Sequence, residues 1–106
     1  MPFLSIDGLR ESEPVPGFRL RFVHSGSMTI AFWDIEAGAA MPEHAHPHEQ
    51  VAIMIEGEFE LVVGGEPRVV RPGDVAVIPS GTPHSGRALT RCRINDAFHP
   101  ERDEWR

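Results

Sequence analysis

The stretch His44-Ala45-His46-Pro47-His48-Glu49-Gln50 decides which fold and which chemistry the rest of the sequence predicts. His44 and His46 are two residues apart, so on an extended strand both imidazoles point to the same face. Pro47 removes a backbone donor and fixes its own φ, and we expect it to bend the strand so that Gln50 reaches the same space. Imidazole nitrogens beside an amide oxygen suit a first-row divalent metal ion. A solvated surface loop is the alternative interpretation.

A second segment that begins with glycine carries one more candidate ligand. It runs Gly73-Asp74-Val75-Ala76-Val77-Ile78-Pro79-Ser80-Gly81-Thr82-Pro83-His84. Four polar side chains are costly to bury unpaired, and one metal ion would satisfy them all. The predicted ligands are therefore His44, His46, Gln50 and His84. His48 is the alternative to Gln50, although we expect His48 to face solvent or to lie behind the ligands.

The composition indicates one all-β domain over residues 1–106. Ten glycines and ten prolines separate short runs rich in Val, Ile and Phe, a pattern typical of a β sandwich or barrel. Residues 1–16 read as an irregular lead-in, residues 79–83 as a rigid loop that presents His84, and residues 99–106 as a single helical turn. The expected strands are 18–23, 28–36, 50–56, a return strand 58–63, 67–71, 74–78 and 89–98.

Charge and hydropathy exclude several classes of protein. The formal net charge is −6 and the chain has no lysine, which argues against a nucleic-acid surface. No apolar run approaches the roughly 18 residues of a transmembrane helix, and the first residues do not read as a secretory signal. The single cysteine, Cys92, favours a reducing compartment, and we expect a cytoplasmic protein. His24 falls in a turn and is expected to face water.

Two spaced patterns resemble the two motifs of the cupin family. Gly38-x5-His44-x-His46-x3-Gln50-x6-Gly57 is similar to cupin motif 1 (residues 38–57), and Gly73-x5-Pro79-x-Gly81-x2-His84 is similar to motif 2 (residues 73–88). Ala88 stands where motif 2 often has asparagine. The resemblance implies a double-stranded β-helix, or jelly-roll barrel, with a divalent metal at its mouth. The neutral ligand set does not choose among nickel, manganese, iron, zinc, copper and cobalt.

The C-terminal sequence narrows the resemblance. Asp96-Ala97-Phe98-His99-Pro100-Glu101-Arg102-Asp103-Glu104 looks like the ending of the KdgF-type cupins, which linearise 4,5-unsaturated monouronates from pectin and alginate. That likeness implies a metal-dependent isomerase-type enzyme for an anionic sugar. Asp96 would move protons, Arg102 would clamp the substrate carboxylate, and Phe98 would form an apolar wall. The simpler alternatives are a turn cap, an exposed ion pair and a core side chain, respectively.

Two other functions fit the same motifs. One is a small cupin dioxygenase that uses the same four ligands, and the other is a non-catalytic cupin that binds a sugar or small anion. Small jelly rolls leave edge strands open, and unprotected edges favour pairing with another chain. We therefore expect a homodimer.

Overall fold

The computed structural model describes residues 2–105, so the two end positions of the predicted 1–106 domain, Met1 and Arg106, lie outside the described residues. Over that range no helix is long and apolar enough to cross a membrane. The elements are η1 (Ile6–Gly8), β1 (Ser12–Val15), β2 (Phe18–His24), β3 (Thr29–Ile35), β4 (Ala40–His44), β5 (Glu49–Glu56), β6 (Phe59–Val63), β7 (Glu66–Val70), β8 (Val75–Ile78), β9 (His84–Ala88) and β10 (Cys92–His99).

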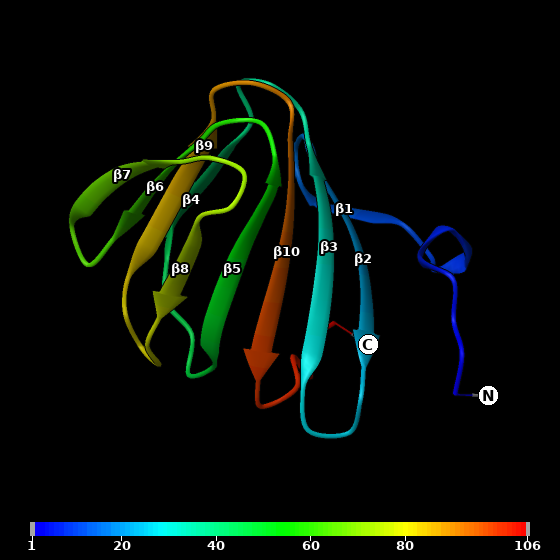
Figure 1. Cartoon of the computed structure of the whole chain (residues 1–106). Coiled ribbons are helices and arrows are strands. Elements are labelled where there is room, and N and C mark those ends of the chain that lie inside the picture. Colours follow the sequence, from blue (N-terminus) through cyan, green and yellow to red (C-terminus); the bar gives the residue numbers. More distant parts are fainter. Residues whose placement is uncertain (1, 106) are drawn as a thin grey trace.

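The strands form two antiparallel sheets that face each other, which confirms the predicted all-β jelly-roll class (Figure 1). One sheet has the strand order β1-β2-β3-β10-β5-β8, and the other has the order β4-β9-β6-β7. The last strand, β10, lies between β3 and β5 and pairs with both. The last strand therefore sits in the middle of the larger sheet rather than at its edge.

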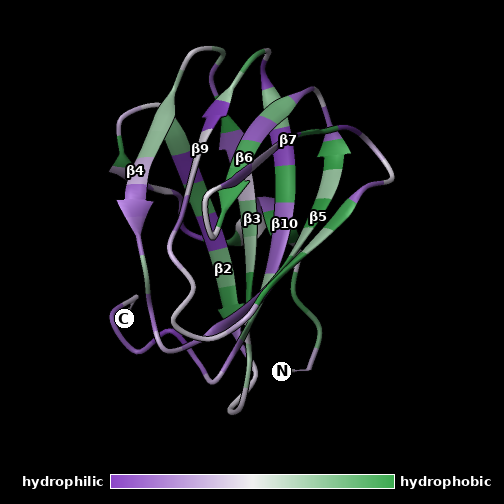
Figure 2. Cartoon of the chain, turned by 90° about the vertical axis from the view of Figure 1, so that its left-hand side faces the viewer, coloured by the Kyte–Doolittle hydropathy of each residue, from purple (hydrophilic) through white to green (hydrophobic). Residues whose placement is uncertain are grey.

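The core follows from the alternation of side chains along the strands, visible as alternating colours in Figure 2. In β3 every second residue is buried, beginning with Thr29. β10 has the same pattern, and its inward residues are Cys92, Ile94, Asp96 and Phe98. Because successive side chains on a strand point to opposite faces, Asp96 and Phe98 share the interior, as the sequence predicted.

Several predicted elements were wrong in detail. Residues 12–15 form β1 instead of part of an irregular lead-in, and residues 58–63 do not return along β5 but enter the other sheet. His84 begins β9 rather than ending a loop. In the tail, residues 103–104 form a hydrogen-bonded turn in which the Trp105 N–H donates to the Arg102 carbonyl oxygen at 3.0 Å, and the described residues 99–105 contain no helix. The error at residues 58–63 arises because turn residues mark where a strand stops but not which sheet the next strand joins.

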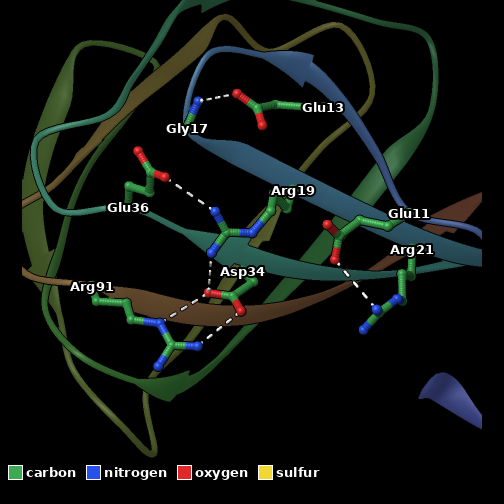
Figure 3. Close-up of polar contacts among 8 residues, drawn as sticks. All are labelled: Glu11, Glu13, Gly17, Arg19, Arg21, Asp34, Glu36 and Arg91. Atoms are coloured by element: carbon green, nitrogen blue, oxygen red, sulfur yellow. Dashed lines mark hydrogen bonds and ion pairs between the residues drawn. The ribbon is translucent and has the colours of Figure 1, made fainter.

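A charged cluster braces the outer face of the larger sheet (Figure 3). Arg91 forms a two-pronged contact with Asp34, at 3.1 and 2.9 Å, and holds the pKa of that carboxyl below its usual value. Arg19 contacts Asp34 at 3.6 Å and Glu36 at 3.1 Å. Exposed pairs of this kind contribute roughly 0–1 kcal/mol each, so the cluster is a modest stabilising feature.

Candidate metal centre

Strand pairing brings the two histidine-bearing segments together. His44 ends β4 and His84 begins β9, and the two residues lie directly opposite each other in the smaller sheet. Their ring centroids are 4.2 Å apart, and the His46 ring lies 4.9 Å from that of His84. One ring nitrogen from each of the three histidines falls within 4.8 Å of the others. Residues 40 positions apart in sequence thus share one small space.

Backbone carbonyl groups fix the tautomer of all three rings. Each Nδ1 lies within hydrogen-bond distance of a carbonyl oxygen: His44 with Pro42 (2.9 Å), His46 with His48 (3.0 Å) and His84 with Thr82 (2.8 Å). A carbonyl oxygen only accepts, so each Nδ1 carries the proton and each neutral ring keeps its lone pair on Nε2. Backbone bonds of this kind are what orient histidine ligands in metal sites.

Gln50 presents an oxygen to the same lone pairs. It is buried on β5, and its Oε1 lies 3.1 Å from Nε2 of His46. The amide NH₂ of Gln50 is then available to the carboxyl group of Asp96, and its interaction with that group lowers the pKa of Asp96. Two acceptor atoms, Oε1 of Gln50 and Nε2 of His46, therefore face each other. Such a pair is stable only with a proton or a cation between the two atoms.

A proton between these atoms is disfavoured by the surroundings. Burial, followed by the nearby charge of Arg102, lowers the pKa of His46. Burial also lowers the pKa of His84. Both rings therefore stay neutral to a lower pH than free imidazole, which keeps the Nε2 lone pairs available to a metal ion.

The arrangement fits a divalent metal ion. Nε2 of His84 is buried and makes no hydrogen bond to any of the described residues, and such an orphaned acceptor is costly unless a ligand satisfies it. Two metal–nitrogen bonds of about 2.1 Å span up to about 4.2 Å, so small side-chain rotations bring the three rings onto one ion. The geometry brings together all four predicted ligands, His44, His46, Gln50 and His84.

Asp96 is a buried carboxyl group next to this cluster. It is 7% exposed, and its Oδ2 accepts a hydrogen bond from Nε1 of Trp33 at 3.0 Å. Its Oδ1 is buried and has no partner with hydrogen-bond geometry within residues 2–105. Burial raises the pKa of Asp96 to about 7, against the opposing effects of Gln50, Trp33 and Arg102. A group with this pKa can both take and give a proton near neutral pH.

Arg102 is held rigidly at the same end of the barrel. Its guanidinium carbon lies 4.7 Å from the centre of the Phe98 ring and 4.3 Å from that of Trp105. Nε and Nη2 contact Oε2 of Glu104 at 2.8 and 2.7 Å. The Arg102 side chain is only 12% exposed. Phe98 is 2% exposed and is a core residue, and its ring also forms one of the two aromatic surfaces on which Arg102 stacks.

A cavity of about 210 Å³ runs through the barrel and joins these groups. His44, Gln50, His84, Asp96 and Arg102 line its polar part. Apolar side chains such as Trp33, Met54 and Leu61 line the remainder. The cavity thus combines a histidine cluster, a buried carboxyl group and a cation, the small set of convergent polar groups typical of ligand sites.

Two other histidines differ in how they match the sequence prediction. Of the two positions expected for His48, solvent or behind the ligands, the structure shows the second: His48 is 8% exposed, its carbonyl oxygen accepts from Nδ1 of His46, and its Nε2 donates to the carbonyl oxygen of Glu101 at 3.1 Å. His24 is half-buried and hydrogen-bonded to Thr29 instead of facing water. The sequence reading also missed Trp33, Glu104 and Trp105. Of these three residues, only Trp33 could have been placed in the interior from the sequence, because it follows the inward alternation of its strand.

Asp96 should make the stability of the metal-free protein depend on pH. Its pKa rises from 3.8 to about 7 on folding, so the protonated group favours the folded state at low pH and that contribution is lost as the pH approaches 7. Relative to Asp96→Asn, the unfolding free energy of chelator-treated protein should fall by about 3 kcal/mol between pH 5 and pH 8. Urea denaturation at pH 5 and pH 8 measures the unfolding free energy of both proteins, and the same pH dependence in the two would contradict this role of Asp96.

Comparison with known proteins agrees with this geometry. The model of the cupin domain family matches residues 31–98. The structure of KdgF from Halomonas sp. superposes with a TM-score of 0.92 at 28% identity, over 100% of this chain and 99% of that one. The pectin degradation protein KdgF of Dickeya dadantii is 31% identical over 70 residues, 64% of each chain. The quercetin 2,3-dioxygenase of Bacillus subtilis is 44% identical over 52 residues, 47% of this chain.

The lengths of these proteins limit what the likeness covers. The chain spans 15% of the Bacillus dioxygenase and 64% of the Dickeya protein, less than two thirds of each. The family match, in contrast, takes in more than half of this chain and both histidine-bearing segments. On that match, and on the two-sheet barrel with its histidine cluster, this chain belongs to the cupin domain family.

Proposed function

We propose that the protein is a metal-dependent isomerase that opens the ring of 4,5-unsaturated monouronates and yields a linear keto acid. One observation carries the proposal: a buried carboxyl group with a pKa of about 7, Asp96, shares a cavity with Arg102 and with His44 and His84 of the three-histidine cluster. Proton transfer, a cation site and an anion site are the three requirements of this reaction. The likeness to the KdgF proteins supports the choice of substrate.

The reaction needs no oxidant and no second substrate. The Asp96 carboxylate takes the proton of the anomeric hydroxyl, C1 becomes a carbonyl, and the bond from C1 to the ring oxygen breaks. The electron pair stays on the ring oxygen as an enolate conjugated with the carboxylate. Protonation of C4 by the same Asp96 gives the keto acid, so the proton taken from oxygen is returned to carbon and the product is an isomer of the substrate.

His44, His46, Gln50 and His84 would hold the metal ion. A bound divalent ion supplies positive charge that offsets the negative charge developing on the substrate oxygen. The lowered pKa values of His46 and His84 keep these two rings neutral for this role. The sequence and the donor set leave nickel, manganese, iron, zinc, copper and cobalt as candidates.

Arg102 is suited to bind the substrate carboxylate. Glu104 uses Nε and Nη2 on one edge of the guanidinium, and the remaining N–H groups of the fork are donors that a carboxylate accepts. Stacking between Phe98 and Trp105 fixes the plane of the fork. The proposal thus gives Arg102 an orienting role, while Phe98 forms the apolar wall.

Ultraviolet absorbance tests the reaction directly, because the conjugated double bond disappears when the ring opens. Metal-loaded protein should remove the absorbance of an unsaturated galacturonate or mannuronate faster than buffer alone does. The matched control is Asp34→Asn, which changes a carboxylate on the outer face. Equal rates with and without the wild-type protein would refute the proposed function.

A cupin dioxygenase is the second candidate. The apolar lining of the cavity, with Trp33, Phe59 and Leu61 among its residues, suits an aromatic substrate better than a sugar. The local identity with quercetin 2,3-dioxygenase points in the same direction. Oxygen consumption with iron-, copper- or nickel-loaded protein and a flavonol would favour this function, and its absence together with uronate turnover would exclude it.

We expect a cytoplasmic homodimer, and the surface of the larger sheet supports the second part of that expectation. Ile53, Ile55, Val75 and Val77 are 40–69% exposed on β5 and on the edge strand β8. Exposed edge strands with apolar side chains favour pairing with another chain. Light scattering at micromolar concentration should give twice the mass of the 11.8 kDa chain, and a monomer would contradict it.

A further inference from the structure

The segment that follows β10, residues 100–105, carries Arg102 and is called the strap here. In Figure 1 it turns back from the end of β10 toward β2. Its aromatic residue, Trp105, packs against Phe22, Trp33 and Phe98, with ring centroids 5.7, 6.0 and 5.3 Å apart. Arg102 and Trp105 line the same cavity as the histidine cluster. The position of the strap therefore sets the position of the guanidinium.

His24, at the end of β2, contacts the strap by two routes. Its Nδ1 lies 2.7 Å from Oγ1 of Thr29, and that oxygen accepts the backbone N–H of Arg102 at 2.9 Å. Its Nε2 lies 3.3 Å from the carbonyl oxygen of Trp105. The His24 ring also packs on Phe22, with centroids 5.0 Å apart. One ring thus links the backbone of Arg102 to the residue on which its guanidinium stacks.

The hydrogen-bond partners assign a role to each atom. The Trp105 carbonyl only accepts, so Nε2 of His24 carries the proton, and Nδ1 of the neutral ring accepts from the Thr29 hydroxyl. The Thr29 oxygen then uses a lone pair for the Arg102 N–H. Thr29 is fully buried. Each donor has an acceptor in all three contacts, so His24, Thr29 and the strap form one hydrogen-bond network.

The other end of the strap is fastened separately. The Glu101 carbonyl accepts from Nε2 of His48 at 3.1 Å, and Oε2 of Glu101 accepts from the Gly26 N–H at 2.5 Å. Gly26 lies in the turn between β2 and β3, so the same hairpin holds the strap at two points. Loss of the His24 contacts should loosen Arg102 and Trp105 while Glu101 stays attached.

We infer that His24, through Thr29 and Trp105, is a positioning residue that holds the Arg102 guanidinium in the orientation required to bind the substrate carboxylate. The inference rests on the proposed function for the identity of the substrate, whereas the contacts of His24 with Thr29 and Trp105 do not depend on it. His24 lies outside the ligand set and touches no reacting atom. Its removal should therefore weaken substrate binding and leave the metal centre intact.

The test compares His24→Phe with His24→Gln in metal-loaded protein. Phenylalanine keeps the packing on Phe22 but loses both hydrogen bonds, whereas glutamine has an N–H donor and an oxygen acceptor at its end. His24→Phe should raise KM for the unsaturated uronate about tenfold with kcat within about threefold of wild type, because uniform binding is lost. His24→Gln should restore KM to within about threefold of wild type.

A readout without substrate accompanies the kinetics. The Arg102 Nε–H is protected by Glu104, and its proton exchange in ¹⁵N-labelled protein reports how firmly the guanidinium is held. His24→Phe should speed that exchange at least about tenfold, and His24→Gln should not. Thr29→Val removes the acceptor of the Arg102 N–H and so breaks the route through Thr29, but it leaves the contact between His24 and Trp105. It should also speed the exchange, and the double variant should show less than the sum of the two effects because both changes break the route through the Thr29 hydroxyl.

The outcomes separate the two proposals. Wild-type exchange and wild-type KM in His24→Phe would overturn the positioning role, as would an equal defect in His24→Gln. If exchange is faster in His24→Phe but the wild-type protein does not turn over the uronate, the positioning role stands and only the proposed function is refuted. Thermal unfolding of each variant shows that it is folded, and Thr29→Val serves as the test if His24→Phe is not.

Discussion

Replacement of His84 by alanine should lower the affinity for a divalent metal ion at least about 100-fold, since loss of even an outer hydrogen-bond partner of a ligand costs about 10–100-fold. The buried Nε2 of His84 has no hydrogen-bond partner among the described residues. Its removal takes one of three converging imidazoles from the cluster. Isothermal titration of chelator-treated protein with nickel, zinc and manganese measures the change.

The matched control is His99→Ala. His99 is 58% exposed and contacts Glu49 on the outside of β10, so its loss should leave metal affinity within about threefold of wild type, as for ordinary surface substitutions. His44→Ala provides a second test at a half-buried position, in case His84→Ala unfolds. Wild-type affinity in both folded variants would remove the histidine cluster from the account.

Asp96→Asn should lower kcat for the unsaturated uronate about 1000-fold, within the range of about 100- to 10,000-fold assigned to a positioned acid–base group. Asparagine keeps an oxygen for the indole N–H of Trp33 and nearly the same volume. It neither takes nor gives a proton near pH 7, which the Asp96 carboxyl, with a pKa raised to about 7 by burial, is able to do.

Metal content distinguishes this effect from damage to the site. Asp96→Asn should bind the same amount of metal as wild type, because His44, His46 and His84 remain in place. The control Asp34→Asn makes the same chemical change on the outer face and should keep full activity. Full activity in metal-loaded Asp96→Asn would remove Asp96 from the reaction.

The local part of the fold was predictable because it depends on side-chain alternation and turn residues. The inward pattern of β10 follows directly from Cys92, Ile94, Asp96 and Phe98, and Gly64-Gly65 marks the hairpin between β6 and β7. The spacing of His44 and His46 likewise placed two rings on one side. These features follow from short-range sequence patterns and can be predicted without knowledge of tertiary contacts.

The parts of the fold and of the candidate site that could not be predicted depend on contacts between residues distant in sequence. Nothing in the local sequence shows that His44 faces His84 across β4 and β9, or that Trp33 donates to Asp96, 63 residues away. The burial of His48 and the half-burial of His24 depend on the strap, which reads locally as a polar tail. Family motifs supplied the four predicted ligands, three histidines and Gln50, but not the contacts that orient them.

The central claim is that His44, His46, Gln50 and His84 bind one divalent ion. Anomalous diffraction from crystals of metal-loaded protein, collected at the absorption edge of the metal, tests it most directly. A single strong peak per chain is expected, between the three Nε2 atoms and Oε1 of Gln50. A peak elsewhere, or no peak with Oε1 of Gln50 still facing His46, would contradict it.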